Sequence, residues 1–408
     1  MAAPPAHPGG QLSARPGRAQ VPPPVPLPRY GSAALADLVP SLLSALGAPG
    51  FANPLGVEPA ASVCVAVIDG LGAELVAEHA AEAPFLTACG GTALTAGFPA
   101  TTAASLASLG TGRPPGEHGL VGYTMLVPGQ PVPMNNLTWA PYGLQPGGDG
   151  GDLLHRVVPE QLQPEATAFE RAAAAGVAVT LVGPRQHAHS GMTRAVLRGG
   201  TYRPAFSLAD LVAVTAQTLA EPGTQLVYAY HADLDLLGHI RGVDSDAWRL
   251  QLAEVDAALA TLAGRLPAGA LLVVTGDHGM VDLRHEDHVD VGDVPALLAG
   301  VRALGGEARA RHVYTEPGAT GEVLAAWREL LGDRMWVVER EEAIAGGWFG
   351  PSVPDRVRPR IGEVVAAAYG RVGVMQRAVD PAHSRMVGHH GSMTAREQLV
   401  PMIAVRTP

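Results

Sequence analysis

Acidic and imidazole side chains follow three of the four buried apolar runs in the sequence and recur near its C-terminus. The groups that follow the runs are Asp69, Asp233, Asp235, His239, Asp277 and His278. His389 and His390 stand later in the glycine-flanked sequence GHHG. Carboxylate oxygens and imidazole nitrogens are good ligands for Zn²⁺ and Mn²⁺. One Asp-His pair is common in solvated loops, so the repetition is what indicates a metal site.

The apolar runs that would position these groups have the character of buried parallel strands. They are ASVCVAVIDGLG, GVAVTLVG, TQLVYAYH and ALLVVTGDHG, at residues 61–72, 176–183, 224–231 and 270–279. Ala- and Leu-rich segments with helical spacing lie between them, as at 246–266. This alternation predicts an α/β fold, with a mostly parallel central sheet and helices on both faces. Ligands bind beyond the carboxyl ends of such strands, where the acidic and imidazole groups would converge.

The chain divides into three regions by composition. Residues 1–30 are rich in Pro and Gly, which predicts a flexible arm. Residues 284–380 contain shorter apolar segments around a helical stretch at 320–332, which predicts a smaller inserted α+β subdomain. Residues 31–283 and 381–408 would then form the catalytic core. The insertion would come just before the C-terminal loop that carries His389 and His390.

Composition excludes several classes of partner. The chain of 408 residues has a net charge of −10, which argues against a surface that binds nucleic acid. Its two cysteines are too few for a disulfide framework. The sequence shows no apolar run long enough to cross a membrane and no secretory signal at its N-terminus. These features predict a cytoplasmic protein, and they leave its oligomeric state open.

Two adjacent threonines occupy the predicted start of a helix in FPATTAASLASLGTG, at residues 98–112. A threonine at this place can cap the helix by accepting a hydrogen bond from a free backbone N–H. Alternatively, a hydroxyl held at a helix N-terminus can act as a nucleophile toward phosphate. Neither role can be given to Thr101 or Thr102 from this segment alone.

The motifs together resemble the alkaline phosphatase superfamily, most closely its nucleotide pyrophosphatase/phosphodiesterase branch (type I phosphodiesterases). Members carry, in order, an Asp after the first strand, a Thr nucleophile, Asp-x-x-Gly-His, Asp-His-Gly and a late Gly-x-His-Gly. This chain has VIDG, FPATTAASLASLGTGRPPGEHG, DLLGH, GDHGM and GHHG in the same order. One such motif is weak, but five in order are specific.

The resemblance implies two divalent metal ions, Zn²⁺ in the first place with Mn²⁺ as the alternative. One ion would be held by Asp235, His239 and His390. The second ion would be held by Asp69, Asp277 and His278, with the oxygen of Thr102 as a further ligand. Asp233 and His389 are expected to have supporting or purely structural roles.

The resemblance also distinguishes the two threonines. In the family, the nucleophile lies four residues after the Phe of a Phe-Pro pair and nine residues before a Thr-Gly pair. Phe98 and Thr111 therefore both indicate Thr102, and Thr101 becomes the helix cap. Animal members have Asn three residues after the nucleophile, where this chain has Ser105. Ser105 and Tyr123 are the candidate substrate-binding residues.

The implied activity is that of a metal-dependent phosphodiesterase or nucleotide pyrophosphatase. It would hydrolyse a phosphodiester or phosphoanhydride bond of a small, nucleotide-like molecule through a covalent phospho-threonine intermediate. A phosphomonoesterase is the main alternative, although such enzymes generally use Ser with an adjacent Arg, and no Arg lies between Asp69 and Arg113. A phosphomutase and a non-catalytic metal-binding scaffold are the remaining alternatives.

Overall fold

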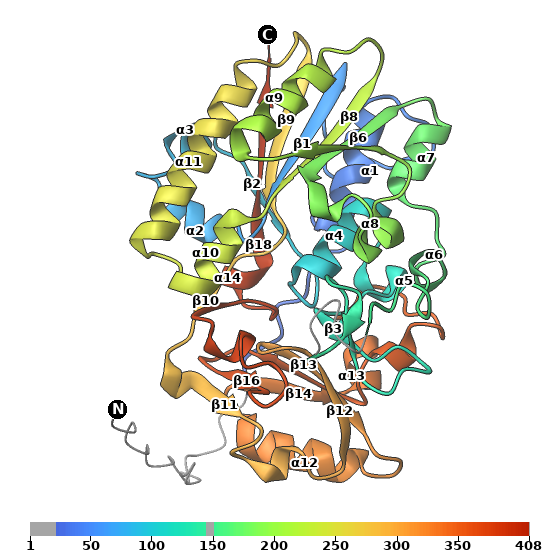
Figure 1. Ribbon diagram of the computed structural model, residues 1–408, viewed down its shortest axis with the longest axis vertical. Helices are drawn as coiled ribbons and strands as arrows, with labels where there is room; N and C mark the ends of the chain where they lie inside the picture. Colours follow the sequence, from blue (N-terminus) through green and yellow to red (C-terminus); the bar gives the residue numbers. More distant parts are fainter. Residues whose placement is uncertain (1–21, 144–150, 408) are drawn as a thin grey trace.

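A computed structural model describes residues 22–143 and 151–407, and a seven-stranded sheet forms its larger part (Figure 1). The strand order is β2-β18-β9-β1-β8-β6-β7. These strands are β1 (Ser62–Ile68), β2 (Thr92–Thr95), β6 (Ala178–Pro184), β7 (Thr201–Ala205), β8 (Gln225–His231), β9 (Ala270–Gly276) and β18 (Leu399–Arg406). Neighbours from β9 to β7 pair in parallel, whereas β18 runs antiparallel to β9 and to β2. All four predicted strand runs are present.

Alternate side chains of the central strands enter two separate cores. Val63, Val65 and Val67 of β1 belong to one apolar cluster, and Cys64 and Ile68 belong to the other. This two-residue alternation is the reason that the run is apolar throughout, because both faces of the strand are buried.

Helices cover both faces of this sheet, as the sequence predicts. One face carries α1 (Leu35–Ala45), α4 (Thr102–Thr111), α7 (Ala168–Ala174) and α8 (Gly191–Val196). The other carries α2 (Ala73–Glu78), α3 (Pro84–Cys89), α9 (Leu208–Leu219) and α11 (Asp246–Ala263). Further helices are α5 (Pro115–His118), α6 (Pro159–Leu162), α10 (Asp233–Arg241), α13 (Arg340–Ala345) and α14 (Ala395–Gln398).

A second, four-stranded sheet lies below the large sheet in Figure 1. It is antiparallel, in the order β12 (Val301–Glu307), β13 (Ala310–Thr315), β15 (Val364–Ala368) and β14 (Met335–Glu339). Helix α12 (Thr320–Leu331) buries Val323, Leu324 and Trp327 against it. These elements fall within residues 284–380, although the domain boundaries themselves stay a prediction.

Small sheets of two or three short strands surround the junction between the two sheets. They are β3 (Thr124–Met125), β4 (Met134–Asn135) and β5 (Ala140–Pro141), then β10 (Val281–Asp282) with β17 (Gly388–His389), and β11 (His288–Asp290) with β16 (Gly373–Met375). A buried ion pair also joins the parts, because Arg309 donates from both Nε and Nη2 to the Glu397 carboxylate. Glu397 accepts from the backbone N–H of Ser392 as well, which holds the loop after His390.

The predicted N-terminal arm lies partly outside the described residues, which begin at residue 22. The described part contacts the protein body. The indole of Trp336 donates to the carbonyl of Pro23 at 2.7 Å, and the backbone N–H of Arg29 donates to Thr95 Oγ1 at 2.8 Å. Among residues 22–143 and 151–407, none of the helices combines the length and apolar character that a membrane crossing requires.

Candidate active site

The predicted metal ligands gather at the carboxyl ends of three adjacent strands, β9, β1 and β8. Asp69 follows β1 directly, and Asp277 and His278 follow β9. Asp235 and His239 lie on α10, which begins two residues after β8. The sixth residue, His390, arrives from β17 near the C-terminus. Parallel pairing brings these segments together, as the strand-end argument predicts.

Two groups of side chains are close enough to hold an ion each. The ligand atoms of Asp69, Asp277 and His278 lie within 4.8 Å of one another, and so do those of Asp235, His278 and His390. His239 Nε2 lies 3.3 Å from Asp235 Oδ2, and its ring centroid is 5.1 Å from that of His390. The second group thus includes His278 where the resemblance implies His239. The two carboxylate oxygens of Asp235 face different imidazoles, with Oδ2 toward His239 and Oδ1 toward His390.

The three histidines share one orientation. Each has Nδ1 within hydrogen-bond distance of a backbone carbonyl: His239 at 2.7 Å from Gly388, His278 at 3.1 Å from Gly279 and His390 at 2.9 Å from Ala100. In the tautomer that donates from Nδ1, the Nε2 lone pair of each ring is free. A metal-binding histidine is usually oriented in this way.

The carboxylates at this place are buried and incompletely paired. Asp69 Oδ1, Asp235 Oδ1 and Asp277 Oδ2 have no hydrogen-bond partner within the described protein. Burial raises the pKa of Asp69, and the adjacent Asp277 and Asp235 add to the rise. Burial likewise raises the pKa of Asp277. Unpaired buried carboxylate oxygens are costly, and a divalent cation is the partner that suits such a cluster.

His239 and Asp235 form a strongly interacting pair beside that cluster. Burial lowers the pKa of His239, but the Asp235 carboxylate outweighs burial and raises it to about 9. Burial opposes ionisation of Asp235, yet His239 and His390 hold its pKa below the ordinary value. The pair therefore favours the charged form of each partner while no cation lies between them.

The two threonines occupy the first positions of α4. Thr101 is the N-cap residue, as predicted, but its side chain makes no cap hydrogen bond. This corrects the expected role of its hydroxyl, which instead lies close enough to the Glu307 carboxyl to lower its pKa, against the larger effect of burial. Thr102 is the first residue of the helix, and its Oγ1 lies 3.1 Å from His278 Nε2. Thr102 is thus placed directly against one of the two candidate ligand groups.

The two candidate substrate-binding residues are placed differently. Tyr123 lines the cavity at the site, and its hydroxyl oxygen accepts from Asn135 Nδ2 at 2.7 Å. Its O–H proton thus remains available to a ligand. Ser105 is buried, its Oγ has no partner within the described protein, and it is not among the residues that line the described cavity. A substrate contact by Ser105 stays a prediction.

Two residues at the site were missed in the sequence. Tyr230, near the end of β8, donates its hydroxyl to Asp69 Oδ2 in a short hydrogen bond. The two-residue spacing of Tyr228 and Tyr230 in the strand run predicts that both face the same side, and this signal was available.

Glu307, the last residue of β12, is the second missed residue. Its Oε2 lies 3.9 Å from His390 Nδ1, and burial raises its pKa to about 8. It comes from the small sheet, in a glycine-rich turn that shows no local sign of chemistry. Only the packing of the small sheet against the large one brings it to the site.

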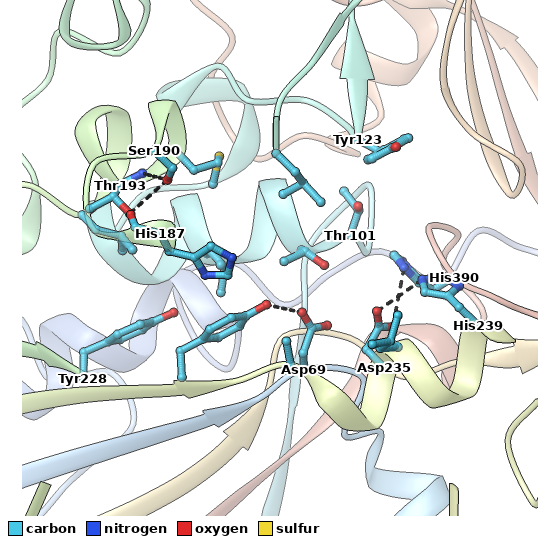
Figure 2. A pocket seen from close by; sticks show the side chains of 18 of the residues that line it. Asp69, Thr101, Tyr123, His187, Ser190, Thr193, Tyr228, Asp235, His239 and His390 are labelled. Carbon is cyan, nitrogen blue, oxygen red and sulfur yellow. Dashed lines mark hydrogen bonds and ion pairs between the residues drawn. The ribbon is translucent and has the colours of Figure 1, made fainter. Parts of the chain in front are cut away.

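A cavity of about 400 Å³ connects these groups (Figure 2). Asp235, His239 and His390 lie toward the right of the view, whereas His187, Ser190, Thr193 and Tyr228 lie toward the left. We call these the ligand half and the apolar half of the cavity. The apolar half is lined by Leu106 of α4, Leu181 and Val182 of β6, Met192 and Leu197 around α8, and Tyr202, Tyr228 and Tyr230.

Comparison with known families agrees with the sequence motifs. The profile of the family described as Type I phosphodiesterase / nucleotide pyrophosphatase matches residues 63–393. The chain therefore belongs to this family, which places it among the phosphoester hydrolases and confirms the resemblance stated above.

Curated relatives that match over part of the chain are phosphopentomutases. The one from Sinorhizobium fredii is 34% identical over 186 residues, or 42% of this chain and 44% of the relative. The match to the Anaeromyxobacter sp. enzyme is 32% over 160 residues, so the chain spans less than half the length of these relatives.

Solved structures share the fold at low identity. Murine ectonucleotide pyrophosphatase/phosphodiesterase 5, an inactive variant in complex with AMP, superposes with a TM-score of 0.61 and 19% identity, over 85% of this chain and 88% of that one. Phosphonoacetate hydrolase from Sinorhizobium meliloti, in complex with phosphonoformate, gives a TM-score of 0.63 and 20% identity, over 86% and 91%. These similarities confirm the mostly parallel α/β fold.

Proposed function

We propose that this protein is a metal-dependent phosphodiesterase or nucleotide pyrophosphatase with Thr102 as its nucleophile. The observation that carries the proposal is the shared orientation of the three histidines. Each anchors Nδ1 on a backbone carbonyl and presents Nε2 to buried, incompletely paired carboxylates beside Thr102. Burying carboxylate oxygens without partners would destabilise a purely structural core, whereas two bound cations would supply those partners.

The residues present fit two divalent ions. Asp69, Asp277 and His278 would hold one ion, and Asp235, His390 and His239 would hold the other, with Zn²⁺ favoured by the mixed oxygen and nitrogen donors. Bound there, such ions would stabilise negative charge on the attacking and departing oxygens. Asp235 bridges the two imidazoles geometrically, and Tyr230 fixes the orientation of the Asp69 carboxylate.

Thr102 would carry the phosphoryl group between two displacements. In the first, Thr102 Oγ1 forms a bond to phosphorus as the bond to the leaving oxygen breaks; the hydroxyl proton is released, and the leaving oxygen takes up a proton from solvent. In the second, a water oxygen bonds to phosphorus and gives up one proton to solvent, the Thr102 oxygen leaves and takes up a proton from solvent, and the phosphorylated product departs. The hydroxyl is held for attack by its place at the start of α4 and by His278.

Uncharged donors would orient the phosphoryl oxygens. Because the Thr101 side chain does not cap α4, the first backbone N–H groups of this ten-residue helix stay available to an anion. The Tyr123 hydroxyl accepts from Asn135, so its own proton can be donated to a phosphoryl oxygen. Among the described residues that line the cavity, no Arg is present to bind a second negative charge.

A phosphomutase is the second candidate, because the partial matches are to phosphopentomutases. A sugar phosphate monoester carries two negative charges, however, and it would meet carboxylates without a guanidinium or ammonium group among the described lining residues. The same argument applies to a phosphomonoesterase. Both alternatives therefore rank below hydrolysis of a singly charged diester.

A hydrolysis panel with metal-replete protein tests the proposal. The substrates are bis-4-nitrophenyl phosphate, thymidine 5′-monophosphate 4-nitrophenyl ester and 4-nitrophenyl phosphate. We expect higher kcat/KM for the first two than for the monoester. A clear preference for the monoester would contradict the proposal. Interconversion of ribose phosphates without release of a phosphoryl group would favour the phosphomutase.

A further inference from the structure

We propose that Tyr30, where the N-terminal arm meets the core, is a positioning residue that places Thr102 for attack on the substrate. Its hydroxyl holds the loop between β2 and α4, residues 96–101, which we call the nucleophile loop because it ends directly before Thr102. The inference rests on the proposed function, since it concerns the step in which Thr102 Oγ1 attacks phosphorus.

The Tyr30 hydroxyl connects the nucleophile loop to the segment after α13. It accepts from the backbone N–H of Phe98 at 3.0 Å and donates to the backbone carbonyl of Trp348 at 2.9 Å. The buried Phe98 ring also packs edge-on against Trp348, with the ring centroids 5.2 Å apart. Burial raises the pKa of Tyr30, against a smaller lowering by the Phe98 N–H, so the hydroxyl keeps the proton that it donates. Both bonds can form at once, because a phenol has one O–H donor and free lone pairs.

The residue before Phe98 is held by a second distant side chain. The N–H of Gly97 donates to Gln398 Oε1 at 3.2 Å, and the carbonyl of Gly97 accepts from Gln398 Nε2 in a short hydrogen bond. Gln398 belongs to α14, whereas Tyr30 comes from the opposite end of the sequence. The first part of the nucleophile loop is therefore fixed by side chains that clamp consecutive peptide groups.

The last part of the nucleophile loop contacts the ligand half of the cavity. The Ala100 N–H donates to the carbonyl of Gly391 at 2.9 Å, and the Ala100 carbonyl lies 2.9 Å from His390 Nδ1. Thr102 follows two residues later and begins α4. The loop thus reaches Thr102 from anchors on either side of Pro99, and loss of the Tyr30 anchor would allow the loop to shift before it reaches Thr102.

The arm fixes Tyr30 itself on the strand from which the nucleophile loop departs. The N–H of Arg29 donates to Thr95 Oγ1 at 2.8 Å, and the N–H of Thr95 donates to the carbonyl of Ala33 at 2.9 Å. Thr95 is the last residue of β2. Tyr30 is therefore bracketed by hydrogen bonds to the residue directly before the loop, so its hydroxyl is held in place before substrate binds.

The experiment measures attack by Thr102 on bis-4-nitrophenyl phosphate, with zinc-loaded Tyr30→Phe protein in excess over substrate. The first displacement releases 4-nitrophenol, whereas the second releases 4-nitrophenyl phosphate. Release of 4-nitrophenol should be about ten- to a hundredfold slower than in wild type, because a misplacement of about 1 Å can cost about a hundredfold in rate. KM should stay within about twofold, and bound zinc should be unchanged, since the metal ligands remain.

Tyr314→Phe is the matched control. The Tyr314 hydroxyl, like that of Tyr30, accepts from a backbone N–H, that of Leu126 at 2.9 Å, and donates to a backbone carbonyl, that of Arg360 at 2.5 Å. Neither partner belongs to the nucleophile loop or lines the described cavity. Both variants should lower the melting temperature by similar amounts, but Tyr314→Phe should keep the wild-type rate of 4-nitrophenol release.

The outcomes separate this inference from the proposed function. If wild-type protein releases 4-nitrophenol and Tyr30→Phe does so at the same rate, the positioning role is overturned and the diesterase activity stands. The role is also overturned if Tyr314→Phe is slowed as much as Tyr30→Phe, or if Tyr30→Phe loses zinc in proportion to its rate. If zinc-loaded wild-type protein does not hydrolyse the diester, the proposed function itself fails and takes the inference with it.

Discussion

The two halves of the cavity are built at the same edge of one sheet, yet they have opposite chemistry. The ligand half lies beyond β9, β1 and the start of α10, where carboxylates and imidazoles meet. The apolar half lies beyond β6 and β8 and is closed by α4 and α8 with aliphatic and phenolic side chains. Thr102, at the start of α4, stands between them.

The two halves are therefore expected to have different roles, the ligand half in the reaction and the apolar half in the choice of substrate. The ligand half has the groups that can bind cations and place a nucleophile, and those groups are anchored by backbone carbonyls and by one another. The apolar half is lined mainly by aliphatic and phenolic side chains, with His187, Ser190 and Thr193 on the same side of the cavity. Changes in the ligand half should therefore alter turnover and metal content, whereas changes in the apolar half should alter substrate preference alone.

The largest expected effect is the loss of the nucleophile. Thr102→Ala should lower kcat on the order of 10³-fold or more, because it removes the attacking oxygen. Metal content should be unchanged, since the carboxylates and imidazoles remain. Thr102→Ser keeps a hydroxyl and should stay active. Trapping of the phosphoryl group on wild-type protein, with peptide mass spectrometry, should locate it on Thr102. A label on Thr101 would contradict the assignment.

Removal of a ligand carboxylate should have the next largest effect. Asp277→Asn should lower activity by about 10²-fold and reduce bound zinc by one equivalent per chain, measured by elemental analysis. The matched control is Asp233→Asn, because the Asp233 side chain lies nearby on α10 but is 62% exposed. It should keep full metal content. Equal metal loss in both variants would show that the cation site has been placed wrongly.

Metal binding should strengthen as pH rises. Burial and the neighbouring carboxylates raise the pKa of Asp69, and burial raises that of Asp277, so the metal-free protein holds protons that a cation must displace. Affinity should change about tenfold per pH unit for each proton released. The folded metal-free protein also holds these protons more tightly than the unfolded chain does. Its free energy of unfolding should therefore fall as pH rises from the ordinary pKa of Asp through the raised pKa of Asp69 and Asp277.

Thermal unfolding with and without zinc checks this sign. The difference in melting temperature between the two forms should be larger near pH 7 than near pH 5. A difference that shrinks as pH rises would show that the carboxylates are already ionised and paired in the metal-free protein.

A change in the apolar half should alter substrate binding more than turnover. Met192→Gln keeps the length of the side chain but adds an amide to the apolar wall. KM for aryl diesters should rise about three- to tenfold, with metal content unchanged. Met402→Gln is the control, since Met402 lies on β18 and does not line the described cavity. Loss of metal in Met192→Gln would break the separation between the two halves.

The smallest effect is expected at Thr101. Its side chain does not cap α4 and lies near the Glu307 carboxyl, so Thr101→Ala should cost no more than about 1 kcal/mol of stability. Activity should change by no more than about twofold, within the usual range for a neighbour that does not react. Thr101→Ser should restore the stability. A Thr101→Ala variant as inactive as Thr102→Ala would reverse the two roles.

Much of the fold and of the ligand half was predictable because the signals are local. The four apolar runs have the length and composition of strands buried on both faces, and all four form the large sheet. Three of the four, β1, β8 and β9, have Asp or His at or just after the carboxyl end, so the parallel arrangement alone predicts convergence. The hydroxyl of Thr101 was the exception. Its N-cap position was right, but the hydrogen bond expected from that position gave way to the tertiary contact with Glu307.

The sequence by itself determined the order of the motifs, the strands that carry them and the position of Thr102 at a helix start. These follow from side-chain periodicity and from residues a few positions apart. Only the tertiary structure decided that His278 groups with Asp235 and His390, and that the Tyr30 hydroxyl reaches the loop before Thr102. It also brought Glu307 from the small sheet to the imidazole of His390, 83 positions away along the chain (390 minus 307). Such contacts depend on how separate elements pack, and no local pattern of residues records that packing.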